Sequence, residues 1–255
     1  DADDDPDDNE DATDEEAESD HKGVFSGFVL LSKGKWDKQQ FIRDMKEKWD
    51  ITVEEDENKS DHAVVFDVGD MIAAVSLMPY PIPGSEAETN AENNYMWPDA
   101  VKAAKEHSAH IMVAVLGKEE DVLEKGKLYT KLVAACCRQK YATGVYTSGV
   151  VFEPRFYEGF ADMMKEGELP IFNWIWFGLY RDKSGMNAYT YGLDVFGKDE
   201  MEVLGTDAEP GDLRDFLASL VSYVLENDVE LHTGETIGFS ADDKHTITRS
   251  PGVSL

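Results

Sequence analysis

Apolar residues recur along the first part of the chain with two periods, one typical of strands and one typical of helices. Residues 24–31 (VFSGFVLL) and 110–116 (HIMVAVL) are apolar at nearly every position, which predicts strands that are buried on both faces. Phe41, Met45 and Trp49 recur at helical spacing and predict an amphipathic helix. The expected order is strand 24–31, a helix from Asp37, strands 62–67 and 71–78, a helix from Pro98 to His107, and strand 110–116.

The same β-α-β-β-α-β order appears again after a helix predicted for residues 121–141. The later elements are strand 144–153, helix 155–166, a hairpin within 170–205, helix 212–226, and a last hairpin at 236–239 and 245–248. The repeated order predicts an α+β fold of two tandem ferredoxin-like (βαββαβ) halves joined by a helix. The expected domains are a disordered acidic leader (1–22), a first half (23–118), the linker helix (119–142) and a second half with the terminal hairpin (143–255).

The hairpin within 170–205 holds the densest group of aromatic residues, and Asp182-Lys183-Ser184-Gly185 is its turn signal. Its strands are apolar on both faces, so we expect the other half to cover the second face. Sheets that pack face to face can leave a cavity near these aromatic residues, and a cavity is the default place for a ligand. The candidate ligand-binding residues are Trp174, Trp176, Tyr189, Tyr191, Arg181 and Asp194.

Each candidate also has a structural interpretation. The aromatic side chains can simply fill the core. Arg181 and Asp194 are expected on paired strands, where an ion pair between them would fix the register of the hairpin. Asn173 is a further polar residue that we expect to be buried in this segment.

The chain carries a formal net charge of −29 at pH 7. Residues 1–20 contribute thirteen acidic residues, no basic residue, and no apolar side chain larger than alanine, which predicts disorder. The remainder holds 40 acidic and 24 basic residues, and a surface this acidic repels phosphate backbones. We therefore expect no nucleic-acid partner and favour a basic protein partner. No apolar run reaches ~18 residues, so no membrane span is predicted.

Common catalytic and cofactor motifs do not occur in the sequence. It contains no Gly-x-Gly-x-x-Gly, no phosphate loop and no Gly-x-Ser-x-Gly, so neither a cofactor nor a catalytic residue is assigned. His107 and His110 form a close pair, but the predicted start of a strand at His110 turns them apart, so no metal site is expected. The adjacent Cys136 and Cys137 favour buried free thiols and a reducing, cytoplasmic compartment.

Several stretches of the sequence resemble one family. They are residues 28–31 (FVLL), the helix and strand from Ala100 to Gly117, residues 189–203 (YTYGLDVFGKDEMEV) and residues 234–239 (GETIGF). Together they resemble the bacterial domain-of-unknown-function family numbered 4261, across residues 24–255. The resemblance implies no assigned activity, cofactor or catalytic residue. Relatives of such domains are sometimes linked to toxin–immunity loci, which is an association rather than a mechanism.

The favoured function is a soluble, non-enzymatic binding module whose acidic surface engages a basic protein partner, as an immunity-type neutraliser would. An alternative is an enzyme or small-ligand binder that uses an aromatic cavity between the two halves. A third hypothesis is a structural subunit of a larger assembly. The sequence leaves the oligomeric state and the identity of any ligand open.

Overall fold

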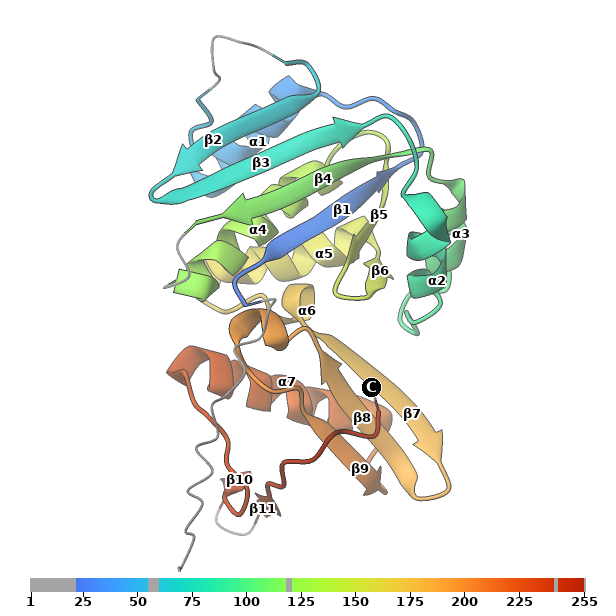
Figure 1. Ribbon diagram of the computed structural model, residues 1–255, viewed down its shortest axis with the longest axis vertical. Coiled ribbons are helices and arrows are strands. Elements are labelled where there is room, and N and C mark those ends of the chain that lie inside the picture. Colours follow the sequence, from blue (N-terminus) through green and yellow to red (C-terminus); the bar gives the residue numbers. More distant parts are fainter. Residues whose placement is uncertain (1–21, 55–59, 118–120, 241–242, 255) are drawn as a thin grey trace, which may run out of the picture.

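Residues 22–54, 60–117, 121–240 and 243–254 are described by a computed structural model, in which two units lie along the long axis of the molecule (Figure 1). The first unit is built on a six-stranded antiparallel sheet with the strand order β2-β3-β4-β1-β5-β6. Its strands are β1 (Phe25–Leu31), β2 (Ala63–Val68), β3 (Met71–Met78), β4 (Ala109–Leu116), β5 (Ala142–Thr147) and β6 (Val150–Phe152).

Three helices cover one face of this sheet, namely α1 (Lys38–Trp49), α4 (Val122–Cys137) and α5 (Pro154–Ala161) (Figure 1). Helix α4 is central, because it contacts four strands of the sheet and both of the other helices. The strand residues of this core, such as Val29, Ile111 and Val113, are fully buried. The main hydrophobic core therefore lies between α4 and the sheet, which stabilises the unit through burial of apolar surface.

The opposite face of the sheet is covered only in part. Helices α2 (Glu86–Ala91), which follows the short helix η1 (Pro83–Ser85), and α3 (Ala100–Glu106) lie over β5 and β6. Beneath them is a small second core that includes Leu30 and Val151. Toward the other edge of the sheet, this face is open, and Val65, Ile72 and Leu116 are exposed. Leu116 belongs to β4, so the prediction that this strand is buried on both faces is not met along its whole length.

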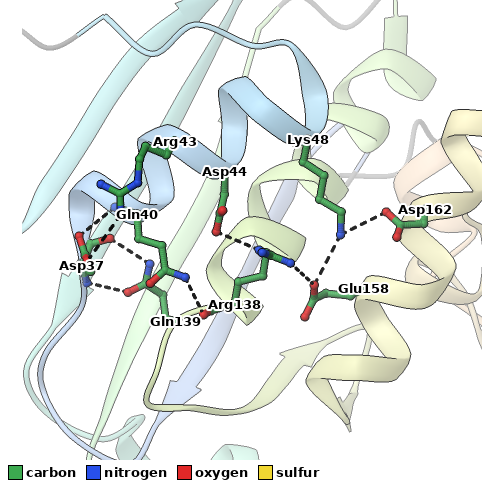
Figure 2. A network of polar contacts seen from close by, with 9 residues as sticks. All are labelled: Asp37, Gln40, Arg43, Asp44, Lys48, Arg138, Gln139, Glu158 and Asp162. Carbon is green, nitrogen blue, oxygen red and sulfur yellow. Dashed lines mark hydrogen bonds and ion pairs between the residues drawn. The ribbon is translucent and has the colours of Figure 1, made fainter.

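A network of ion pairs and hydrogen bonds fixes α1 against α5 and the C-terminal end of α4 (Figure 2). Arg138 lies at its centre, with Nε 3.0 Å from Asp44 Oδ2 and Nη1 3.6 Å from Glu158 Oε2. Lys48 extends the network, since its Nζ lies 3.5 Å from Glu158 Oε2 and 3.3 Å from Asp162 Oδ1. Acidic and basic side chains thus alternate along the network, which links α1, the end of α4 and α5.

The second unit follows α5. It begins with the short helices η3 (Asp162–Glu166) and α6 (Ile171–Trp174), and its three-stranded antiparallel sheet has the order β7-β8-β9. Helix α7 (Pro210–Asn227) packs on β7 and β8. The remaining elements are β7 (Trp176–Asp182), β8 (Gly185–Tyr191), η4 (Asp194–Phe196), β9 (Glu202–Thr206) and the hairpin of β10 (Thr236–Ser240) and β11 (Asp243–Thr246).

The mixed class of helices and antiparallel sheets is confirmed, but two tandem ferredoxin-like halves are not. A split β-α-β unit would place β3 next to β1, whereas β4 lies between them here. Strands β5 and β6, assigned from the sequence to the second half, extend the first sheet beside β1, so the boundary expected at 142/143 falls inside that sheet. The expected linker helix is α4, which packs on the sheet. The acidic leader, apart from Lys22, lies outside the described residues.

Local predictions had mixed outcomes. The single strand expected at 144–153 is a hairpin, because Ser148 and Gly149 adopt positive φ angles of 49° and 65° and reverse the chain. The start of the segment expected as a hairpin forms α6, and α2 lies between strand 71–78 and the helix expected from Pro98, where no element was predicted. The turn at Asp182–Gly185 is confirmed, since it joins β7 to β8.

Candidate functional site

An open pocket of about 290 Å³ lies where the two units meet. The first unit contributes the start of β1, the β5–β6 turn and Tyr129 of α4. The second unit contributes the end of α6, the end of β8 and η4. Because both units supply walls, the shape of the pocket depends on how they dock.

The β5–β6 turn forms one rim of the pocket. The Ser148 hydroxyl donates a hydrogen bond of 2.8 Å to the carbonyl oxygen of Trp174, which ties the turn to α6. The Tyr191 ring lies against Gly149, where an added Cβ would be only 2.9 Å from Tyr191 Cε1. The positive φ of Gly149 and this close approach both favour glycine at the rim.

Aromatic side chains form the inner wall. The rings of Trp174 and Phe196 have centroids 4.9 Å apart, and those of Phe25 and Phe196 are 5.5 Å apart. Trp174 is anchored from behind, because its Nε1 donates a hydrogen bond of 2.8 Å to Thr130 Oγ1 on α4. These contacts bury Trp174 almost completely, so the wall is rigid as well as apolar.

Glu200 positions the opposite wall. Its Oε1 accepts hydrogen bonds from the backbone N–H groups of Gly192 and Leu193 at 2.6 and 2.8 Å, and its Oε2 accepts one from Thr190 Oγ1 at 2.6 Å. Burial raises the pKa of Glu200 above its ordinary value, although these hydrogen bonds act in the opposite direction and the nearby Asp194 adds to the rise. The carboxylate thereby fixes the segment that carries Asp194.

Two residues that line the pocket carry hydrogen-bond acceptors with spare capacity. Asn173 is 1% exposed; its Nδ2 donates to the carbonyl oxygen of Tyr157 at 2.8 Å, but its Oδ1 is buried without a partner. Asp194 accepts a hydrogen bond from the backbone N–H of Val195 at 2.9 Å and forms no ion pair within the described ranges. Among the described residues that line the pocket, Asp194 is also the only charged one.

The structure brings three of the six predicted candidates to this pocket, namely Trp174, Tyr191 and Asp194. The other three lie elsewhere. Trp176 packs between the units, with its ring centroid 5.1 Å from that of Tyr95, and the Tyr189 ring covers Gly178 on the neighbouring strand. Whether any of the six binds a ligand stays a prediction.

The ion pair expected between Arg181 and Asp194 does not form. Arg181 is exposed near the end of β7 and pairs in register with Met186. Strand β8 ends at Tyr191, and Asp194 lies beyond it in η4. The prediction extended the second strand as far as Asp194. The strand in fact ends before Gly192, because the φ of 117° at Gly192 does not fit a strand.

Sequence reasoning missed Glu200 and the turn at Ser148-Gly149. A Ser-Gly pair inside an apolar run is a recognised turn signal and could have located the rim. Glu200 carries no comparable signal, since it is one of 53 acidic residues. Its role depends on the backbone conformation of residues 190–193.

The histidine pair is placed in the structure as two separate buried groups. His107 accepts a hydrogen bond at Nε2 from the backbone N–H of Ile82 at 2.9 Å and also contacts the carbonyl oxygen of Ala104 through Nδ1. His110 Nδ1 bonds the carbonyl oxygen of Tyr80 at 2.9 Å, and burial lowers the pKa of His110. In the part of the chain that the structure describes, no group of three or more His, Cys, Asp and Glu residues is arranged to hold a metal ion.

The adjacent cysteines, Cys136 and Cys137, are free thiols buried at the end of α4. Burial raises the pKa of both thiols above the ordinary value. They are therefore packing residues in this structure. Within the described ranges, none of the helices has the length and apolarity needed to cross a membrane.

The fold and the pocket define a mixed α and antiparallel-β protein with a candidate binding site at the junction of two units. The model of a family described as a domain of unknown function, DUF4261, matches residues 189–255. This match confirms the predicted resemblance over the part that runs from β8 onward and includes Tyr191, Asp194 and Glu200. Searches among curated proteins and among solved structures gave no match.

Proposed function

We propose that this chain is a non-enzymatic binding protein whose acidic surface engages a basic protein partner at the junction of the two units. The observation that carries the proposal is an acidic segment beside the pocket. Residues 80–99 contain Glu86, Glu88, Glu92 and Asp99 and no lysine, arginine or histidine. A surface of one sign steers a partner of the opposite sign and strengthens encounter at low ionic strength.

Contacts fix this segment next to the pocket. Asn93 Nδ2 donates a hydrogen bond of 3.0 Å to the carbonyl oxygen of Gly149 at the rim. Tyr95 reaches the second unit, where its hydroxyl donates a hydrogen bond of 2.9 Å to the carbonyl oxygen of Phe177. Glu92 and Asp99 are exposed, so their charges face solvent and any approaching partner.

The proposed partner class rests on charge, since the matching family has no assigned function. We propose a basic toxin as the partner and an immunity-type, neutralising role in the bacterial cytoplasm for this chain. The buried free thiols Cys136 and Cys137 suit a reducing compartment. Binding of this kind requires no catalytic group and no cofactor.

Peptide binding tests the proposal. The probes are a lysine/serine peptide and a glutamate/serine peptide of equal length, titrated from about 50 to 300 mM salt, a range over which screening of exposed charges increases strongly. We expect only the lysine peptide to bind, with an affinity that falls as salt rises. Binding that is insensitive to salt, or equal binding of both peptides, would contradict the proposal.

A pair of double variants localises the effect. Glu92→Gln/Asp99→Asn removes two charges beside the junction, whereas Asp61→Asn/Asp70→Asn removes two exposed charges near β2, at the far edge of the sheet. Both variants change the net charge equally. The first should weaken lysine-peptide binding more than the second, and equal effects would show that the peptide is not held at the junction.

The pocket supports a second candidate function, an enzyme or small-ligand binder that uses the junction. Its volume of about 290 Å³ lies just below the range of roughly 300–1,000 Å³ usual for ligand sites. A thermal-shift screen of metabolites separates the two functions, because a ligand that binds the native state raises the melting temperature. A screen without any shift would remove this candidate.

A further inference from the structure

Several donors around the junction pocket already take part in hydrogen bonds within the protein. The Tyr129 hydroxyl donates to Thr147 Oγ1 at 3.1 Å, and the Ser148 hydroxyl donates to the Trp174 carbonyl oxygen at 2.8 Å. The backbone N–H of Gly192 is held by Glu200. A ligand that needs donors from these groups would have to break existing hydrogen bonds.

Two residues that line the pocket, Asn173 and Asp194, carry acceptor oxygens with spare hydrogen-bonding capacity. The amide orientation of Asn173 is fixed, because its Nδ2 donates to the Tyr157 carbonyl oxygen at 2.8 Å and so leaves Oδ1 as the unpaired atom. A buried amide oxygen without a partner is destabilising, and a ligand donor that reached it would satisfy it. Asp194 adds a negative charge that no base within the described ranges neutralises through an ion pair.

The remaining wall is aromatic. Phe25, Trp174 and Phe196 form a continuous set of ring contacts, and Tyr191 lies at the rim. Aromatic faces attract cations through the quadrupole of the ring, most strongly where water is excluded. An apolar stem can pack on the same rings, so the wall suits a group that combines an alkyl chain with a terminal cation.

We infer that the junction pocket binds a single organic cation, a primary ammonium or a guanidinium carried on a short apolar stem. Its N–H groups would donate to Asp194 and Asn173, and its stem would contact Trp174 and Phe196. This inference builds on the proposed function, in which the cation is a lysine or arginine side chain of the basic partner. A free amine is the other source of the same chemistry.

Calorimetric titration of the full chain tests the inference with four probes. Nα-acetyl-lysine methylamide and Nα-acetyl-arginine methylamide represent side chains of a partner, and n-pentylamine represents a free amine. Nα-acetyl-norleucine methylamide is the uncharged control of similar shape. We expect the cationic probes to bind at least about tenfold more tightly than the control, because a hydrogen bond to a charged group is stronger than one between neutral groups.

Three variants locate the binding. Asp194→Asn removes the pocket charge, Tyr191→Leu removes the rim ring from an exposed position, and Asp70→Asn removes an exposed charge far from the pocket. We expect Asp194→Asn to weaken cation binding roughly tenfold, Tyr191→Leu to weaken it less, and Asp70→Asn to leave it nearly unchanged. Melting temperatures of all three variants report whether each one is folded.

The outcomes separate this inference from the proposed function. If Asp194→Asn and Asp70→Asn have equal effects, or if the norleucine probe binds as tightly as the lysine probe, the pocket inference is overturned even where lysine-rich peptides bind. If the small cations bind in the pocket but lysine-rich peptides do not, the inference stands for a free amine and the proposed protein partner is wrong. If Asp194→Asn does not fold, the test relies on Tyr191→Leu. Cation binding that is unchanged in Tyr191→Leu would then overturn the inference.

Discussion

The Tyr191 ring lies directly against Gly149, so one close contact joins the two units at the rim of the pocket. Tyr191 ends β8 of the second unit, and Gly149 belongs to the β5–β6 turn of the first. The contact is possible because glycine lacks a Cβ and tolerates a φ of 65°. Docking of the units and the shape of the pocket therefore depend on the same residue pair.

Replacement of Gly149 tests this dependence. Gly149→Ala should lower the free energy of unfolding by about 2 kcal/mol, because it adds left-handed strain and displaces the Tyr191 ring. Gly69→Ala is the matched control, since Gly69 has a φ of 64° and open space around it. In Gly69→Ala the free energy of unfolding should fall by only about 1 kcal/mol, because only the backbone strain is added. Urea unfolding of both variants measures the difference. An equal decrease in the free energy of unfolding in both variants would show that the Tyr191 contact does not contribute to stability.

Glu200 should give the protein a specific pH dependence. Its pKa is raised above 4.5 in the folded state, so the folded chain binds more protons than the unfolded chain between 4.5 and the raised pKa. Titration of Glu200 therefore increases the free energy of unfolding as the pH falls through this window and decreases it as the pH rises.

Glu200→Gln removes this titration and retains an oxygen that can accept from Gly192 and Leu193. As the pH falls from 7 toward 4.5, the wild type should gain stability relative to the variant. Denaturant unfolding at several pH values measures the difference. A stability difference that does not change with pH would contradict the assigned burial of Glu200.

The ion-pair network should be needed to hold α1 in place. Arg138→Met leaves the buried Asp44 carboxylate without its partner and should lower the free energy of unfolding by about 1–2 kcal/mol. We place the value low because the Arg138 side chain is 43% exposed and is screened by solvent. Lys46→Met is the control, because Lys46 pairs with the exposed Asp50, and its effect in the same urea assay should be much smaller. Similar losses in both variants would show that burial of Asp44 is unimportant.

Cys136 and Cys137 should be unreactive in the native protein. Both thiols are buried and their raised pKa values keep them protonated, whereas the thiolate is the reactive form. A thiol reagent should therefore modify them only as fast as the chain unfolds, and denaturant should expose two equivalents. Rapid modification of the native protein would indicate that the end of α4 opens.

The sequence predicted several elements whose structure depends on near neighbours. Helical periodicity located α1, α4 and α7, and the turn signal located Asp182–Gly185. Pairing between distant strands has no such local signature, and so β5 was assigned to the wrong sheet. Its partner β1 lies more than a hundred residues earlier in the chain, as the pairing of Val29 with Val145 shows.

The candidate site was predicted in the same uneven way. Trp174, Tyr191 and Asp194 were chosen from an aromatic and polar cluster, and all three line the pocket. The unpaired oxygen of Asn173 and the carboxylate of Glu200 have meaning only once the chain has folded around them. Sequence periodicity shows which residues are buried, but it does not show which polar atoms lack partners.

The most direct test of the account is an amide chemical-shift titration of the ¹⁵N-labelled protein with Nα-acetyl-lysine methylamide. We expect the shifts to concentrate at the pocket, including the amides of Gly149, Gly192 and Asp194, and we expect none with the norleucine control. Shifts spread over the exposed acidic residues, or the same shifts with both compounds, would contradict a cation site at the junction.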